Sequence, residues 1–374
     1  MRVLLRAGVM FGFAAVFGAC GQEAPSPVDF NDPAAISANL SSVDSTFDSD
    51  VFRSFSTATV MLDVAASPAI RPATTLLETL RPTLVRSGSQ MFLPGLRQTQ
   101  KLQAMVPSFS ISAAQGRIIP DSMYGRVFEW DTTLHQYTYQ GTMVSGLTGV
   151  RFILYANGLD GTVFEPVTAI GTLDIIDEST PTKLQVQVLV KNSAATTTYV
   201  DYTASVVTGS SSASATVSGS ITNGLSGADY KSLSFDQTSS VDYTSASVHA
   251  TFVLNNPAVT VMLNESFAFN DPNITIYADF RLMQNGQTIR AAGHVTTNTT
   301  TNATTVSVTV YVDGHPVASI SGDPTDPATQ WVDAGGAPLT AVDLAALDDL
   351  FNAFEQFGNT VSNLFNPVST FAGL

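Results

Sequence analysis

The chain has 374 residues, enough for one large domain or two ordinary ones, and its 44% hydrophobic content supports a substantial core. Only 16 lysine and arginine residues stand against 31 aspartate and glutamate residues, so the net charge is −15. Such a surface repels polyanions, which argues against nucleic-acid binding. The single cysteine, Cys20, excludes an intrachain disulfide.

The first predicted element is an export signal over residues 1–19. Arg2 and Arg6 give it a positive start, and the apolar run 9–17 that follows is too short to span a bilayer. It ends in Phe17-Gly18-Ala19-Cys20, which resembles the lipobox of bacterial lipoproteins, although leucine is usual where Phe17 stands. An ordinary export signal that happens to end near a cysteine is the alternative interpretation.

The lipobox resemblance implies an anchor at the N-terminus. In that family the cysteine is acylated and the signal is cut before it, so Cys20 is the expected lipid attachment site. Each buried CH₂ of an acyl chain contributes about 0.8 kcal/mol to membrane affinity. Gly21 stands where lipoproteins retained in the inner membrane usually carry aspartate, so the resemblance places the protein in the outer membrane of a bacterial envelope.

Two segments lead from the anchor toward the predicted sheet. Residues 20–32 are rich in proline and small polar residues, which is typical of a flexible tether. Residues 33–115 are expected to form a helical or mixed segment. Asp32 is the candidate N-cap of its first helix and Pro33 the first helical residue, and apolar residues then recur at helical spacing.

Residues 116–322 predict an antiparallel β domain, because apolar and polar residues alternate with period two. The alternation is clearest in "KLQVQVLVK" (183–191), "NITIYADFRL" (273–282) and "TTVSVTVYVDG" (304–314). It predicts about a dozen strands in a meander. Even the serine-rich stretch 208–220 keeps the alternation, so we expect a strand with a face of small residues there.

Turn signals separate the predicted strands. Asn223-Gly224, Asn285-Gly286 and Asp313-Gly314 are typical of two-residue hairpin turns, in which both residues take positive φ. "VDYTAS" (200–205) recurs as "VDYTSA" (241–246), which indicates either an internal repeat or the chance likeness of short strands.

A loop is expected over 323–339 and an amphipathic helix over 340–366. Thr340 is the predicted N-cap, with Asp343 three residues later, and Pro367 follows the helix. Its apolar stripe comprises Leu347, Leu350, Phe354, Phe357, Val361 and Leu364.

The expected fold is therefore mainly β: a large curved antiparallel meander with an N-terminal helix and the C-terminal helix packed on it. An apolar sheet face must be covered, so a half-barrel, a closed barrel and a sandwich all remain open. The half-barrel with a helix on its concave face resembles the lipoproteins that carry lipids between envelope layers.

No motif for catalysis or metal binding is present. His135, His249, His294 and His315 lack metal-ligand spacing, and nucleophile-elbow, phosphate-loop and dinucleotide-binding motifs are missing. We therefore expect no catalytic residues, no metal and no cofactor, while enzymatic activity stays undecided. Two weaker candidates are calcium binding by the acidic loops 157–161 and 321–333, and a recognition surface around Tyr124, Phe128 and Trp130 with Arg126.

The sequence thus predicts a lipid-anchored, non-catalytic protein of the cell envelope. Its membrane partner is reached through Cys20, and its sheet binds an envelope protein or an apolar ligand. The alternatives are an integral outer-membrane β-barrel, suggested by alternating strands of about ten residues, and an envelope hydrolase.

Overall fold

The structure is a computed structural model that describes residues 117–158, 162–209, 211–242 and 244–349, together with Val51, Ser54 and Phe55. The expected export signal, the lipidated Cys20, the tether, most of the segment 33–115 and the helix beyond residue 349 lie outside the described residues.

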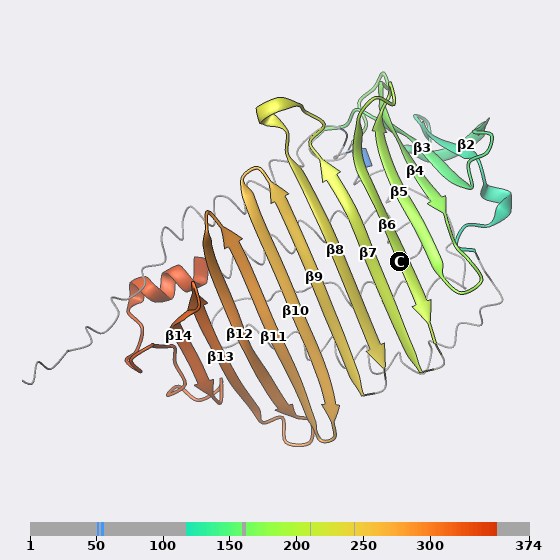
Figure 1. Cartoon of the computed structure of the whole chain (residues 1–374). Coiled ribbons are helices and arrows are strands. Elements are labelled where there is room, and N and C mark those ends of the chain that lie inside the picture. The colour runs from blue at the N-terminus through green and yellow to red at the C-terminus, as the bar shows by residue number, and fades with distance from the viewer. Residues whose placement is uncertain are drawn as a thin grey trace, which may run out of the picture.

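The described chain is dominated by one 15-stranded sheet, which is mostly antiparallel (Figure 1). The predicted mainly β class is confirmed. The strands are β1 (Arg126–Asp131), β2 (Gln136–Met143), β3 (Gly149–Tyr155), β4 (Ala169–Asp177), β5 (Leu184–Asn192), β6 (Thr198–Thr208), β7 (Ser212–Thr222), β8 (Ser232–Asp242), β9 (Ser245–Asn255), β10 (Ala258–Asn270), β11 (Asn273–Gln284), β12 (Gln287–Asn298), β13 (Thr304–Val312), β14 (His315–Gly322) and β15 (Val332–Asp333). Two short 3₁₀ turns, η3 (Asp121–Met123) and η4 (Gly227–Asp229), accompany them.

From β3 to β15 each strand pairs with its neighbours in the chain, as a meander requires. The exception is the N-terminal end, where the order is β4-β3-β1-β2 and β1 pairs with β3 in parallel. The sheet is open, with β2 and β15 at its edges, so it neither closes on itself nor divides into two packed sheets. The barrel and sandwich interpretations of the fold are therefore wrong.

The hairpin turns follow the sequence signals with one exception. Asn285-Gly286 and Asp313-Gly314 join β11 to β12 and β13 to β14, and all four residues have positive φ, between 50° and 82°. At Asn223-Gly224 the prediction is wrong, because only Gly224 has positive φ and a longer loop with η4 joins β7 to β8.

Period-two alternation separates the two faces of the sheet as predicted. In β5, β11 and β13 the alternate apolar residues lie on one face and the polar residues between them on the other. β7 is a strand, and its Ala213, Ala215, Val217 and Ile221 are buried on that same face. We call the buried side the apolar face and the opposite side the outer face.

The two copies of the recurring segment have different structural roles. Residues 200–205 lie within β6, whereas 241–246 run from the end of β8 to the start of β9. The two copies are therefore not equivalent strands of an internal repeat.

The apolar face carries the core of the described structure. The main cluster of buried residues runs across the strands and includes Phe55, Ile119 and Leu347, which come from outside the sheet. The backbone N–H of Tyr155 in β3 donates a hydrogen bond to Ser54 Oγ at 3.1 Å. Ser54 is thereby held beside β3.

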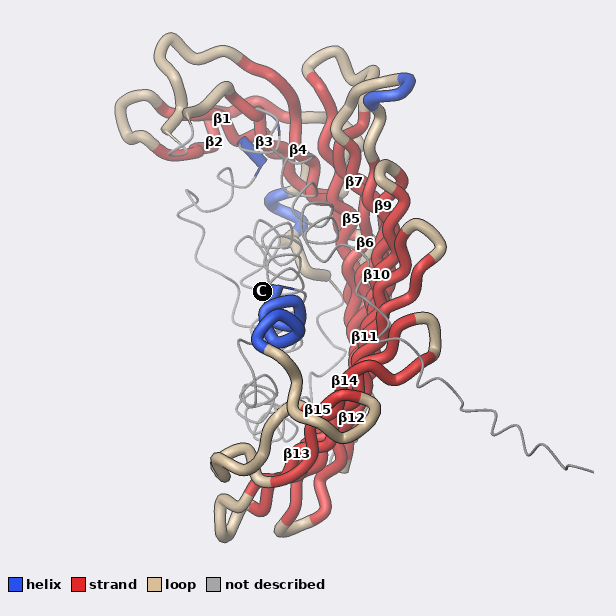
Figure 2. Tube along the Cα trace, turned by 90° about the vertical axis from the view of Figure 1, so that its left-hand side faces the viewer, coloured by secondary structure: helices blue, strands red, loops and turns tan. Residues whose placement is uncertain are grey.

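A short helix, described over 341–349, follows the sheet and lies on the side toward which β1, β2 and β3 project (Figure 2). Its predicted N-cap is confirmed: Thr340 Oγ1 donates to Asp343 Oδ2 at 2.7 Å, and the Asp343 N–H donates back to Thr340 Oγ1 at 3.3 Å. Leu347 is only 2% exposed and belongs to the main cluster. The expected loop 323–339 contains the short strand β15, which pairs with β14.

Candidate functional site

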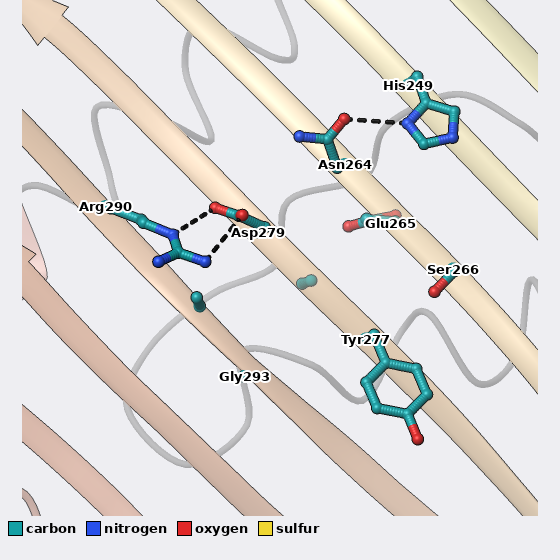
Figure 3. Close-up of a pocket in the computed structure, with 10 residues that line it drawn as sticks. His249, Asn264, Glu265, Ser266, Tyr277, Asp279, Arg290 and Gly293 are labelled. Carbon is teal, nitrogen blue, oxygen red and sulfur yellow. Dashed lines mark hydrogen bonds and ion pairs between the residues drawn. The ribbon is translucent and has the colours of Figure 1, made fainter.

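A depression of about 320 Å³ lies on the sheet between β9 and β12 (Figure 3). We call it the outer depression. Its lining residues are His249, Asn264, Glu265, Ser266, Tyr277, Ala278, Asp279, Arg290, Ala292 and Gly293.

The register of four long strands brings these side chains together. Asn264 of β10 lies opposite His249 of β9 and Asp279 of β11, so three polar residues form one cross-strand row on the outer face. Side chains alternate between faces, and Glu265, next in the chain to Asn264, therefore points toward the apolar face. Together with Ala278 and Gly293 it forms the adjoining row beneath the depression.

Two arginines hold the carboxylate of Asp279. Arg290 donates to it from the neighbouring strand at 2.8 and 3.0 Å, and Arg281 donates from the same strand at 3.2 and 2.9 Å. Partial burial opposes ionisation, but the hydrogen bonds and positive charges of the arginines outweigh it and lower the pKa of Asp279 to about 2. The group is ionised at neutral pH, and the three side chains together carry one positive charge.

The rest of the depression offers polar groups and one exposed ring. His249 Nδ1 lies 2.9 Å from Asn264 Oδ1, and the ring of Tyr277, which is half exposed, lies 5.8 Å from that of His294. Hydrogen-bond donors, acceptors and an aromatic surface suit the binding of a polar partner. Groups of three metal-ligating side chains do not occur within the described ranges.

Three of the four histidines lie in or near the outer face of the sheet. His249 and His294 lie on the outer face, and His315 is exposed beside the β13–β14 turn. The ion pairs of Asp279 were missed. Their signal is the segment "YADFRL", in which Asp279 and Arg281 occupy alternate positions of one strand and must share a face.

The apolar face also carries polar residues, and these too were missed. Glu265 occupies an apolar-face position between the buried Leu263 and Phe267. On β8, Gln237 and Ser239 occupy such positions and are 9% and 1% exposed. We call Gln237, Ser239 and Glu265 the polar belt. In the sequence, "LNESF" and "FDQTSSV" mark it as breaks in the apolar alternation.

The remaining candidates have structural roles. Asp323, Asp326 and Asp333 of the acidic loop each accept hydrogen bonds from backbone N–H groups two to four residues later, at 2.8 to 2.9 Å. Residues 159–161 of the other acidic loop lie outside the described residues. Phe128 and Trp130 are buried, and the Phe128 ring stacks on Phe152 at 5.0 Å, so these aromatic residues serve packing.

No protein-family model, curated protein sequence or solved structure matches the chain. Among the described residues there is no helix of the length and apolar character that a membrane span requires.

Proposed function

We propose that the protein is a lipid-anchored component of the bacterial cell envelope that binds an apolar ligand on the apolar face of its sheet and catalyses no reaction. The anchor is supported by the lipobox-like Phe17-Gly18-Ala19-Cys20 after an export-type apolar run. The outer membrane is its proposed location, since Gly21 follows the cysteine.

The proposal of ligand binding rests on the size and the residue composition of the apolar face. It extends over one open sheet, and it is divided into two buried clusters. The smaller cluster consists of Val206, Ala213, Ala215, Val241, Ala246, Val248, Phe267 and Ile276. Three of these eight are alanines, so this cluster carries less side-chain volume than the main one, and in this proposal the ligand chain lies against it. In this proposal the helix that begins at 341 packs on the same face and the sheet acts as a half-barrel.

A second candidate function is the binding of an envelope protein by the outer face. The outer depression favours it, since donors, acceptors and the exposed ring of Tyr277 gather there above a sheet with no other described function.

The anchor is tested with Cys20→Ser. We expect this full-length variant to lose incorporation of a metabolically supplied fatty-acid analogue and to leave the membrane fraction or retain its signal. Ser41→Ala, a similar small change downstream, should leave labelling unchanged. Labelling of the Cys20→Ser variant at the wild-type level would contradict the assignment.

Ligand binding is tested by exposing envelopes that contain the full chain to a photoreactive hydrocarbon chain, followed by peptide mass spectrometry. We expect labelling of apolar-face residues on β6 to β11. Labelling confined to other segments would exclude the apolar-ligand proposal and favour the outer face as the binding surface.

A further inference from the structure

The polar belt would lower the stability of the fold without compensation if the apolar face served only as a core. Ser239 is 1% exposed, and its Oγ has no hydrogen-bond partner among the described residues. Glu265, which is only partly buried, also has no hydrogen-bond or ion-pair partner there, and loss of hydration raises its pKa to about 7. A buried hydroxyl without a partner costs free energy that an apolar residue of similar size would not, and a partly buried carboxylate loses part of its hydration.

The register places the two groups in one line. Ser239 of β8 and Glu265 of β10 both lie opposite Val248 of β9, so they share a cross-strand row and are separated by one strand. Two strand spacings put their backbones about 10 Å apart. The row continues through Ala215 on one side and through Ala278 and Gly293 on the other.

The row that holds the polar groups is built of small and β-branched residues. Ala278 stands directly opposite Glu265, and its short side chain leaves the Glu265 carboxyl without a large neighbour on that strand. Large apolar side chains flank the row: Phe267 belongs to the smaller buried cluster, and Leu263 and Phe280 belong to the main one. The polar groups therefore lie where the two apolar clusters meet.

We propose that the polar belt binds the hydrogen-bond-donating head group, an amine or a hydroxyl, of an otherwise apolar single-chain ligand. The Glu265 carboxyl accepts from the head group, Ser239 contacts a polar atom further along the ligand, and the chain lies over the adjoining apolar cluster. This inference rests on the proposed function and specifies its ligand chemistry. Binding satisfies the two groups that the described residues leave without partners.

The test uses three photoreactive probes in envelopes that contain the full chain. All carry a diazirine on the same carbon of a dodecyl chain, and they end in a methyl, a hydroxyl or an amine group. For the wild type we expect the hydroxyl and amine probes to label peptides of β8 to β11 about tenfold more than the methyl probe, because a hydrogen bond to a charged or shared-proton group is worth that factor.

Substitutions then show which residue is responsible for the preferential labelling by the hydroxyl and amine probes. Glu265→Leu should make the three probes label equally, and Glu265→Gln should remove the preference for the amine. Asp236→Asn, on the outer face of β8, is the matched control and should change nothing. Circular dichroism of each variant confirms that the sheet is formed, and the conservative Glu265→Gln decides the question where Glu265→Leu does not fold.

The outcomes separate this inference from the function on which it rests. Equal labelling of the wild type by all three probes would overturn the inference and leave apolar-ligand binding intact. A head-group preference that persists in both Glu265 variants would also overturn it. Failure of all three probes to label the apolar face would instead remove the proposed function itself.

Discussion

Glu265 is an acidic residue on the apolar face, and its neighbours on that face across both adjacent strands, Val248 and Ala278, cannot ionise. The pKa of Glu265 is raised above its usual value, whereas two arginines lower the pKa of Asp279 to about 2. The two residues come from neighbouring strands and point toward opposite faces, so the arginines of the outer face reach Asp279 but not Glu265. A single step along a strand thus decides whether a carboxyl is paired in the open or left among apolar side chains.

The pH dependence of stability follows from the raised pKa of Glu265. The folded state holds this proton up to about pH 7 and the unfolded state only up to about 4.5, so the folded state binds more protons between these values. Stability should therefore fall as pH rises through this window, by about 2–3 kcal/mol in all. Urea unfolding at a series of pH values should show the slope in the wild type and a flatter one in Glu265→Gln. A Glu265→Gln profile parallel to that of the wild type would place the titrating group elsewhere.

At the scale of elements, the C-terminal helix is joined to the sheet by one deeply buried side chain among its described residues. Leu347 is 2% exposed, while Leu344 of the same helix is 39% exposed. The capping box at Thr340 determines where the helix starts and hence which of its residues reach the apolar face.

Leu347→Ala should therefore lower the free energy of unfolding by about 2–5 kcal/mol, since it removes buried methyl groups and leaves a cavity. Leu344→Ala is the matched control in the same helix, and it should cost less than about 1 kcal/mol. Chemical denaturation of both variants measures the difference. Equal effects would mean that the helix does not pack on the sheet through the Leu347 face.

At the scale of the whole molecule, two strands of the open sheet have only one hydrogen-bonded neighbour among the residues that the structure describes. β2 pairs with β1 alone, whereas β10 pairs with β9 and β11 along almost its whole length. Half of the backbone N–H groups of an edge strand point away from the sheet and cannot join its ladder.

Hydrogen exchange should report this difference. We expect the slowly exchanging amides per residue to be about half as many in β2 as in β10, because protection requires a ladder hydrogen bond. Amide exchange followed by NMR on the purified protein measures both strands together. Full protection of β2 would mean that its free edge is paired in solution, as by a second copy of the chain.

The sequence by itself determined the strands, most turns and the two faces. Period-two alternation and Asn-Gly or Asp-Gly pairs act within a few residues, so each can be read locally, as in β5, β11, β13 and the turns at Asn285 and Asp313. The capping box at Thr340 is local in the same sense. The interruptions of the apolar alternation at Ser239 and Glu265 can also be seen in the sequence, but the sequence does not show that the two residues share one cross-strand row.

Only the tertiary structure decided which residues meet. It inserted β1 between β2 and β3, with a parallel pairing, and left the sheet open instead of closing it. It also brought Ser239 and Glu265 to the two sides of Val248 and gathered His249, Asn264 and Asp279 into one row. Strand order and register depend on free energies of contacts far apart in the chain, and alternation is the same whichever neighbour a strand takes.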